Sequence, residues 1–353
     1  MVTNPTGALT YADWARRIDP DGKEAAIIEL LSQTNEILDD MLVMEGNLPT
    51  GHKTTVRTGL PSATWRLLNY GVPTTKSTTV QITDNCGMLE TYSVIDKALA
   101  DLNGNTAEFR LSEDKAFLEG MNQQMASTLV YGNTAVNPER FMGLAPRYNT
   151  VTTTTAQTAY NVISGGSTTS TNTSIWLVCW GSDTATGIFP KGKITGLQHK
   201  DWGDVRQGYD TNTPQGRYEV YTTHYKWDLG FTLRDWRYVV RIANIDTTST
   251  SPGLLSTTPF NLINALVRAV HRLPTAPVSA GPVQRTDAPT QGMVNRCAFY
   301  CNRLASTYLD IQALNKTNVL LKMEEWDGKP VTTFRGIPVR TVDAITSAEA
   351  YLT

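Results

Sequence analysis

The chain has 353 residues, of which 40% are hydrophobic and 18% are charged, and its 31 basic side chains nearly balance 33 acidic ones. This balance, without any polybasic stretch, argues against tight binding to nucleic acid, and the length predicts two or three domains. No apolar run approaches the roughly 18 residues needed to cross a membrane, and the N-terminus does not have the pattern of a signal peptide.

The first predicted element is a helix over residues 23–44, after an irregular and extended beginning. Asp21 and Glu24 have the spacing of a capping box, and Gly46 with Pro49 ends the helix. The helix presents an apolar face at helical spacing, made of Ile27, Leu30, Leu31, Leu38, Met41 and Leu42.

Residues 48–92 are rich in Thr, Gly and Pro, and the segments KTTVRTG and TTVQIT predict two polar strands around a turn-rich middle. The region has too few apolar residues for a core of its own. An isolated hairpin of this kind is marginal in water unless another surface supports it. We therefore expect it to extend onto a neighbouring subunit.

A second helix is predicted over residues 112–131, with Ser112 as its N-cap and Gly132 at its end. The Thr- and Ser-rich residues 150–174 predict an exposed loop or a weak hairpin. Residues 175–180, IWLVCW, predict a buried strand.

Residues 225–246 are dense in aromatic and β-branched side chains, and from Phe231 onward the two faces alternate with a period of two. They predict a single strand over residues 227–242, which would span roughly 50 Å. Ordinary strands have about 5–6 residues. A strand of this reach is typical of a protein that tiles a surface.

The C-terminal third predicts a compact α/β unit. Its elements are a helix over 260–272, a Pro-rich linker over 274–289, a strand over 296–301, a helix over 306–314, and strands over 319–323, 330–334 and 337–342.

No constellation for catalysis, metal binding or cofactor binding is evident. The Cys297-x-x-x-Cys301 spacing favours two small buried side chains over a metal site, because no second ligand pair exists. The four cysteines are too few and scattered for a disulfide framework, and they indicate a reducing compartment. The histidines, far apart and outside any ligand pattern, are His52, His199, His224 and His271.

Two segments are the most specific in the chain: LRDWRYVVRIANID at residues 233–246, and FYCNRLASTYLDIQAL followed by GKPVTTFRGIPVRTVDAI within residues 299–345. With the order of elements they resemble the major capsid proteins of tailed bacteriophages with the HK97-type fold. The resemblance implies an α+β chain with an N-arm at 1–47, an E-loop at 48–92, a P-domain at 93–253 and an A-domain at 254–353. The P-domain would hold a spine helix at 112–131 and long strands at 217–246.

One departure from this pattern concerns connectivity. The "GIPV" unit follows the long strands here, whereas it precedes them in the commonest version of the fold. This order resembles the permuted topology of some short-tailed phages, such as the Bordetella phage group. It predicts that strands of the P-domain and the A-domain interleave.

The resemblance implies a non-enzymatic protein that assembles as hexamers and pentamers into an icosahedral shell around double-stranded DNA. It implies location in the virion after assembly in the host cytoplasm, and weak non-specific contact with packaged DNA. The implied partners are further copies, a portal protein, a separate scaffolding protein and a decoration protein, with no membrane. The alternative is a phage tail-associated or carbohydrate-binding β-rich protein, which needs converging polar groups that the sequence does not show.

Contacts between subunits are expected from exposed cations and one aromatic side chain. In some members of the family a lysine of the E-loop forms an isopeptide bond with Asn, but salt bridges to acidic residues of a neighbour are the favoured interpretation here. The arginines of residues 233–246 are expected to pair with Asp235, Asp246 or a neighbour rather than with DNA. The hypothesised contact residues are Lys53, Arg57, Trp65, Arg66, Lys76, Arg234, Arg237 and Arg241.

Overall fold

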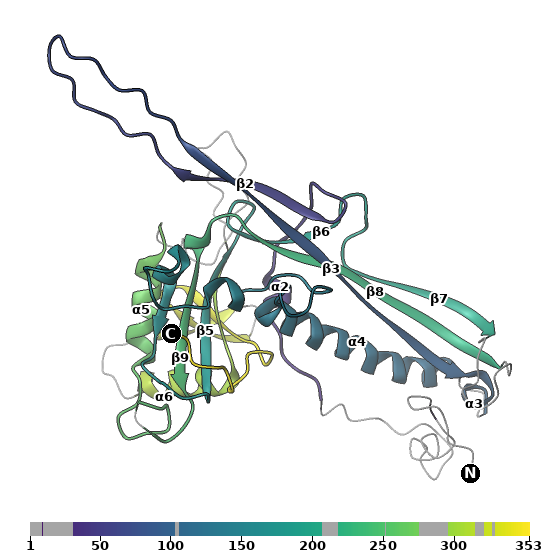
Figure 1. The fold of residues 1–353 in the computed structure, drawn as a ribbon. Helices are drawn as coiled ribbons and strands as arrows, with labels where there is room; N and C mark the ends of the chain where they lie inside the picture. The colour runs from purple at the N-terminus through teal and green to yellow at the C-terminus, as the bar shows by residue number, and fades with distance from the viewer. Residues whose placement is uncertain are drawn as a thin grey trace.

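The computed structural model has an elongated shape, with a long hairpin and a twisted blade of strands extending from a compact part (Figure 1). The described residues are Leu9, 31–102, 106–206, 218–250, 252–274, 296–314, 321–326 and 329–353.

The blade consists of β2 (Gly51–Gly59), β3 (Thr78–Asp96), β7 (Leu197–Arg206) and β8 (Glu219–Leu233). The 19-residue β3 pairs antiparallel with β2 through its first half and with β8 through its second half. The hairpin and the blade therefore share one continuous strand. The two polar strands predicted within residues 48–92 are confirmed.

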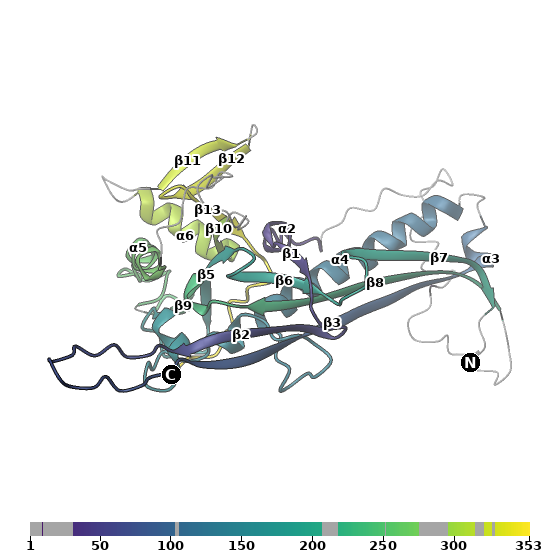
Figure 2. The same cartoon turned by 90° about the horizontal axis from the view of Figure 1, so that it is seen from above.

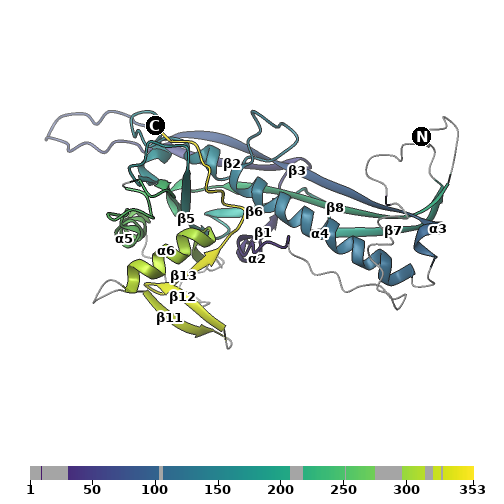
Figure 3. The same cartoon turned by 90° about the horizontal axis from the view of Figure 1, so that it is seen from below.

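Helix α4 (Thr106–Tyr131) lies along the blade (Figure 3). It begins six residues before the predicted start, and Ser112 is not an N-cap. The Ser112 hydroxyl instead donates to the carbonyl oxygen of Phe109 at 2.8 Å inside the helix. Phe109 is buried against Ile95 and Leu99, which draws the first turns of the helix onto the blade. Leu99 belongs to the short helix α3 (Lys97–Ala100).

The single long strand predicted over 227–242 is wrong. Strand β8 ends at Leu233, a 3-10 turn covers η3 (Trp236–Tyr238), and β9 (Val239–Asp246) follows. The Asp235 carboxylate accepts from the backbone N–H of Arg237 at 3.0 Å and closes the turn. The length of the blade comes instead from β3 and from β8, which starts at Glu219 and not at the predicted residue 227.

The compact part is built around β5 (Asn172–Trp180), which lies between β9 and β10 (Arg296–Cys301). β10 continues the sheet through the parallel strand β13 (Ile337–Thr341). Beyond it lie β12 (Lys329–Phe334) and β11 (Leu321–Trp326). The predicted strands of the C-terminal third are confirmed, with boundaries shifted by at most three residues.

Every residue of β5 is buried, which confirms the prediction for 175–180. Trp176 and Trp180 point into a core shared with α4 and β8. Leu177 and Cys179 point into a second core under α5 (Leu262–Arg272) and α6 (Arg303–Leu314). Two-sided burial extends to residues 172–174, so the exposed loop predicted there is wrong.

The Thr-rich region also contains η2 (Gln157–Asn161) and β4 (Val162–Ser164), after the turn η1 (Ala145–Tyr148). Helix α6 starts three residues earlier than predicted, because Asn302 caps it by accepting from the backbone N–H of Ala305 at 2.8 Å. Figure 2 shows the β11–β12 hairpin beyond α6.

The chain passes from the compact part to the blade and back. After β5 it forms β6 (Ala185–Phe189), β7 and β8 before it returns as β9. Because β10 pairs with β5, the strand pairing crosses the boundary expected at residue 253. Strands from the two sides of residue 253 therefore belong to one sheet.

The N-terminal helix predicted over 23–44 is not continuous in its described part. Residues 31–36 are not helical, α2 (Ile37–Asp40) has four residues, and β1 (Val43–Glu45) pairs in parallel with β6. Ile37 is fully buried in the core, so tertiary contacts override the local helical pattern. Residues 23–30 and most of the linker predicted over 274–289 lie outside the described residues.

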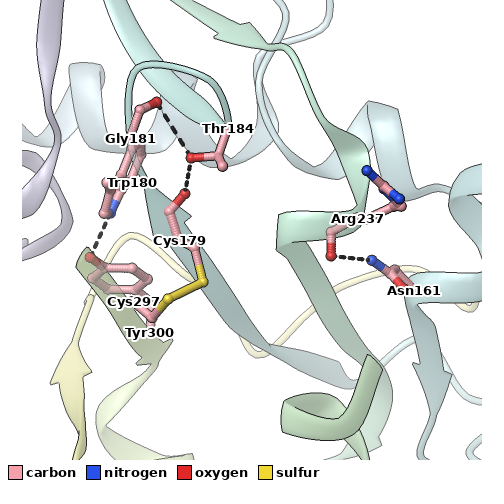
Figure 4. Close-up of a disulfide and its surroundings, with 8 residues drawn as sticks. All are labelled: Asn161, Cys179, Trp180, Gly181, Thr184, Arg237, Cys297 and Tyr300. Atoms are coloured by element: carbon pink, nitrogen blue, oxygen red, sulfur yellow. Dashed lines mark hydrogen bonds between the residues drawn. A yellow bond between two sulfur atoms is a disulfide. The ribbon is translucent and has the colours of Figure 1, made fainter. Parts of the chain in front are cut away.

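The expectation about the cysteines is also corrected. Cys179 on β5 and Cys297 on β10 are directly opposite each other and form a disulfide across the two strands (Figure 4). Cys86 and Cys301 are free. The sequence could not indicate this pair because the two positions are separated by 118 residues.

Candidate assembly surface

The hairpin extends away from the rest of the subunit (Figure 1). Its tip carries exposed apolar side chains. We call residues 46–83 the arm. Trp65 is 101% exposed and Leu68 is 85% exposed, although buried positions are the rule for such side chains in a folded subunit. The other large apolar side chains exposed at the tip are Leu60, Leu67, Tyr70 and Val72.

The two strands of the arm have faces of different character. Val56 lies opposite Val80, and Ile82 points to the same face because side chains alternate along a strand. Lys53 and Arg57, at odd positions, point to the other face. The stem of the arm is therefore amphipathic, with β-branched apolar residues on one side and cations on the other.

All acidic and basic side chains of the arm other than His52 carry positive charge. The arm contains no Asp or Glu, whereas Glu45 and Asp84 flank it directly. Its four basic side chains form no ion pair with any residue that the structure describes. These side chains are Lys53, Arg57, Arg66 and Lys76.

The base of the arm is anchored by a buried carboxylate. Asp84 on β3 is 6% exposed and accepts from Arg147 Nη2 at 2.8 Å. Its second oxygen accepts from the Thr232 hydroxyl at 2.7 Å. Arg147 also donates to the carbonyl oxygen of Phe231 at 3.3 Å. These contacts tie the point where the arm begins to β8 and to the loop after α4.

A second contact at the base joins His52 and Arg234. The Arg234 guanidinium lies 2.9 Å from His52 Nε2. Burial, and then the nearby Arg234 charge, lower the pKa of His52. Close by, a Cβ atom added at Gly51 would lie 2.0 Å from the carbonyl oxygen of Asp84. The backbones of the two strands therefore lie close together where the arm leaves the body.

The remaining arginines of the hypothesised contact set occupy three environments. Arg234 also pairs with the exposed Asp183 at 3.4 Å. Arg237 is bound to Asp235 at 2.7 Å on the surface, so its predicted partner is confirmed. Arg241 is 3% exposed and pairs with Glu349 at 2.8 Å inside the subunit, so its assignment as a contact between subunits is wrong.

Several residues at the tip and at the base of the arm were not expected from the sequence. The apolar tip was signalled by the run WRLLNY within a Thr-rich region, but only Trp65 was selected from it. The anchor formed by Asp84 and Arg147 had no sequence signal, because the two residues lie 63 positions apart.

The described part of the chain holds neither a membrane-spanning helix nor a metal-binding cluster. None of its helices has the length and apolar content needed to cross a membrane. Within the same residues, no group of three His, Cys, Asp or Glu side chains is arranged to hold a metal ion.

The chain is similar along its whole length to a chain of the bacteriophage Epsilon15 structure, with 35% identity, a TM-score of 0.74 and 100% of both chains covered. A chain from the capsid of a native GTA particle is 10% identical, with a TM-score of 0.44, 68% of this chain and 99% of that chain covered. A chain of Mycobacterium phage Bobi is 12% identical, with a TM-score of 0.39, 66% of this chain and 97% of that chain covered. No curated protein matches the chain.

The fold, with its projecting hairpin, spine-like helix and interleaved strands, defines an HK97-like phage capsid protein. The family model of the major capsid protein GP7 matches residues 19–353, so the chain belongs to that family. It is a shell-forming structural protein of the virion. The alternative of a tail-associated or carbohydrate-binding protein is set aside.

Proposed function

We propose that copies of this chain assemble as hexamers and pentamers into an icosahedral shell around phage double-stranded DNA, and that the arm of each copy lies on a neighbour. The observation that carries the proposal is the exposed apolar tip around Trp65, which finds no cover among the described residues of its own subunit. A free monomer rarely exposes a contiguous apolar patch of this kind without a binding role.

The role proposed for each segment follows the domains expected from the sequence. Residues 1–47 and the E-loop at 48–92 serve as extensions toward neighbours. The P-domain at 93–253 supplies the spine helix and the strands β7 and β8 of the blade, and the A-domain at 254–353 supplies much of the compact part. The proposed contact residues are Lys53, Arg57, Trp65, Arg66, Lys76, Arg234 and Arg237.

The proposed partners beyond further copies are a portal protein, a separate scaffolding protein and a decoration protein. Packaged DNA contacts the shell weakly, in keeping with a chain of net charge −2. Assembly takes place in the host cytoplasm, and the chain itself carries no catalytic activity. We propose non-covalent contacts between the copies, so that purified particles give a single monomer band on a denaturing gel.

The test replaces residues 60–77 by a short Gly-Ser turn, which leaves both strands of the arm and the whole body in place. We expect the purified chain to keep its secondary structure by circular dichroism and to lose higher oligomers in sedimentation velocity and negative-stain electron microscopy. Particles formed as readily as by the unaltered chain would contradict an assembly role for the arm.

A further inference from the structure

We propose that an arginine-rich cluster at the end of α5 binds the phosphodiester backbone of double-stranded DNA. The cluster consists of Arg268, His271 and Arg272 on α5, and of Arg335 in the turn between β12 and β13. The inference rests on the function proposed above, in which the shell encloses DNA, and it assigns the weak contact with DNA to particular residues.

The three α5 residues of the cluster share the outer side of their helix. Arg268 lies three positions before His271 and four before Arg272, so the three side chains are neighbours. The opposite side of α5 packs into the second core. Arg268, His271 and Arg335 are exposed. Arg335 Nη1 lies 3.1 Å from His271 Nε2, so the fold brings together basic groups that are 64 residues apart in the chain.

Arg272 is held in place by uncharged groups. Its Nη1 donates to the carbonyl oxygen of Val162 at 2.9 Å, and its guanidinium lies 5.2 Å from the centre of the Tyr160 ring. Burial, and then the nearby charge of Arg268, lower the pKa of Arg272. The positive charge at this point of the surface is therefore concentrated, which favours an anion as the ligand.

Most other arginines of the subunit body have a carboxylate partner. Among the residues that the structure describes, no carboxylate forms an ion pair with any member of the cluster. The arginines paired with a carboxylate are Arg110, Arg147, Arg234, Arg237, Arg241, Arg303 and Arg340. The cluster departs from this pattern and leaves its cations for an external anion.

Arg335 occupies a backbone position that arginine disfavours. Phe334 pairs with Ile337, so β12 and β13 are joined by a turn of two residues. Both turn residues have a positive φ angle, 53° at Arg335 and 76° at Gly336. Asn, Asp and Gly are preferred at such positions, and other side chains are strained there. The geometry of the turn does not explain an arginine, whereas a role for its side chain does.

The chemistry of the cluster favours phosphate over the surface of another protein. Guanidinium groups present planar pairs of donors that match the oxygen atoms of a phosphate group. The centre of a protein interface is depleted in charged side chains, whereas contacts to the DNA backbone need charge and hydrogen-bond donors. Because the cluster is small, it binds DNA weakly and independently of the base sequence, in keeping with a chain of net charge −2.

The experiment measures the binding of a labelled DNA duplex to the full, unassembled chain by fluorescence anisotropy between 50 and 200 mM salt. The test variant carries Arg268→Gln with Arg335→Asn, and Asn is a residue that the turn prefers. The control variant carries Lys115→Gln with Lys191→Gln, which removes the same charge from exposed positions outside the cluster. Thermal unfolding, binding of inorganic phosphate and negative-stain electron microscopy are measured for all three proteins.

We expect the test variant to bind the duplex roughly tenfold more weakly at 50 mM salt, because two contacts with phosphate are lost. The slope of log affinity against log salt becomes smaller by about 2. The unfolding midpoint of the test variant stays the same or rises, and the variant still forms shells. The control variant binds the duplex like the unaltered chain.

The proposal is overturned if the unaltered chain does not bind the duplex, or if the two variants bind it equally. It is also overturned if the variants differ only in binding inorganic phosphate, which would make the cluster a site for a free anion. A test variant that binds DNA normally but assembles poorly would assign the cluster to a contact between copies. Failure of the unaltered chain to form shells contradicts the proposed function instead, because duplex binding is measured before assembly.

Discussion

Arg241 on β9 and Glu349 near the C-terminus form an ion pair of 2.8 Å in which both side chains are only 4% exposed. The Glu349 carboxylate also accepts from the Ser174 hydroxyl of β5, and from the Tyr131 hydroxyl at 2.6 Å. Tyr131 is the last residue of α4, so one buried carboxylate connects the spine-like helix to the central strands of the compact part.

We expect Glu349→Gln to destabilise the subunit by about 3–5 kcal/mol, because it leaves the Arg241 charge buried without a counter-charge. The measurement is the urea midpoint of the purified chain. Glu219→Gln is the control, since Glu219 pairs with Lys97 on the surface at 3.4 Å and its loss costs less than about 1 kcal/mol. Equal shifts for the two variants would show that Arg241 finds another partner.

Asp84→Ala is expected to loosen the base of the arm and to cost about 2–3 kcal/mol, because two hydrogen bonds to a charged group are lost. Hydrogen exchange measured by mass spectrometry follows the amides of β2 and of the first half of β3. Their protection falls in this variant, while Asp183→Ala, at a carboxylate 84% exposed, leaves it unchanged. Unaltered protection in Asp84→Ala would mean that the backbone ladder alone holds the arm.

Gly51→Ala tests the close approach of the two strands. The added methyl group would meet the backbone oxygen of Asp84 at 2.0 Å, so the strands must separate there. We expect lower thermal stability and weaker assembly. Gly71→Ala is the matched control, because nothing lies within 4 Å of its added carbon. A Gly51→Ala protein that behaves like the control would show that the base of the arm adapts easily.

Reduction of the Cys179–Cys297 disulfide by dithiothreitol is expected to lower the free energy of unfolding by about 2–5 kcal/mol, since the bond closes a loop over a separation of 118 residues. The measurement is urea unfolding with and without dithiothreitol. Cys297→Ser reproduces this loss and makes the protein insensitive to dithiothreitol. Cys86→Ser, at a free cysteine, retains the sensitivity. Labelling of all four thiols in the denatured, unreduced protein would contradict the bond.

Acid is expected to destabilise the base of the arm through His52. Its pKa is lowered in the folded subunit by burial and then by Arg234. As the pH falls below about 6.5, the unfolded chain takes up a proton that the folded chain resists, so the stability present above that pH is lost. Unfolding midpoints between pH 7.5 and 5 measure the effect. His52→Gln flattens this dependence, and His199→Gln retains it; identical profiles would refute the assignment.

Local patterns were sufficient where the side chains of one segment determine its structure. The segment KTTVRTG at residues 53–59 predicted a polar strand, and the apolar run in residues 175–180 predicted a buried strand. The same reasoning failed for residues 31–44, because burial of Ile37 and pairing of β1 with β6 outweigh helical spacing. It also failed for residues 227–242, where Asp235 closes a turn within a pattern of strand residues.

By itself, the sequence determined the class of this protein: a near-neutral, Thr-rich chain with a polar hairpin, a long helix and a C-terminal α/β pattern resembles a phage shell protein. Only the tertiary structure decided which residues meet. The pairs Asp84–Arg147, Arg241–Glu349 and Cys179–Cys297 join positions 63, 108 and 118 residues apart. The physical reason is that periodicity reports how a segment faces its surroundings, whereas a contact between distant segments depends on how sheets and helices pack.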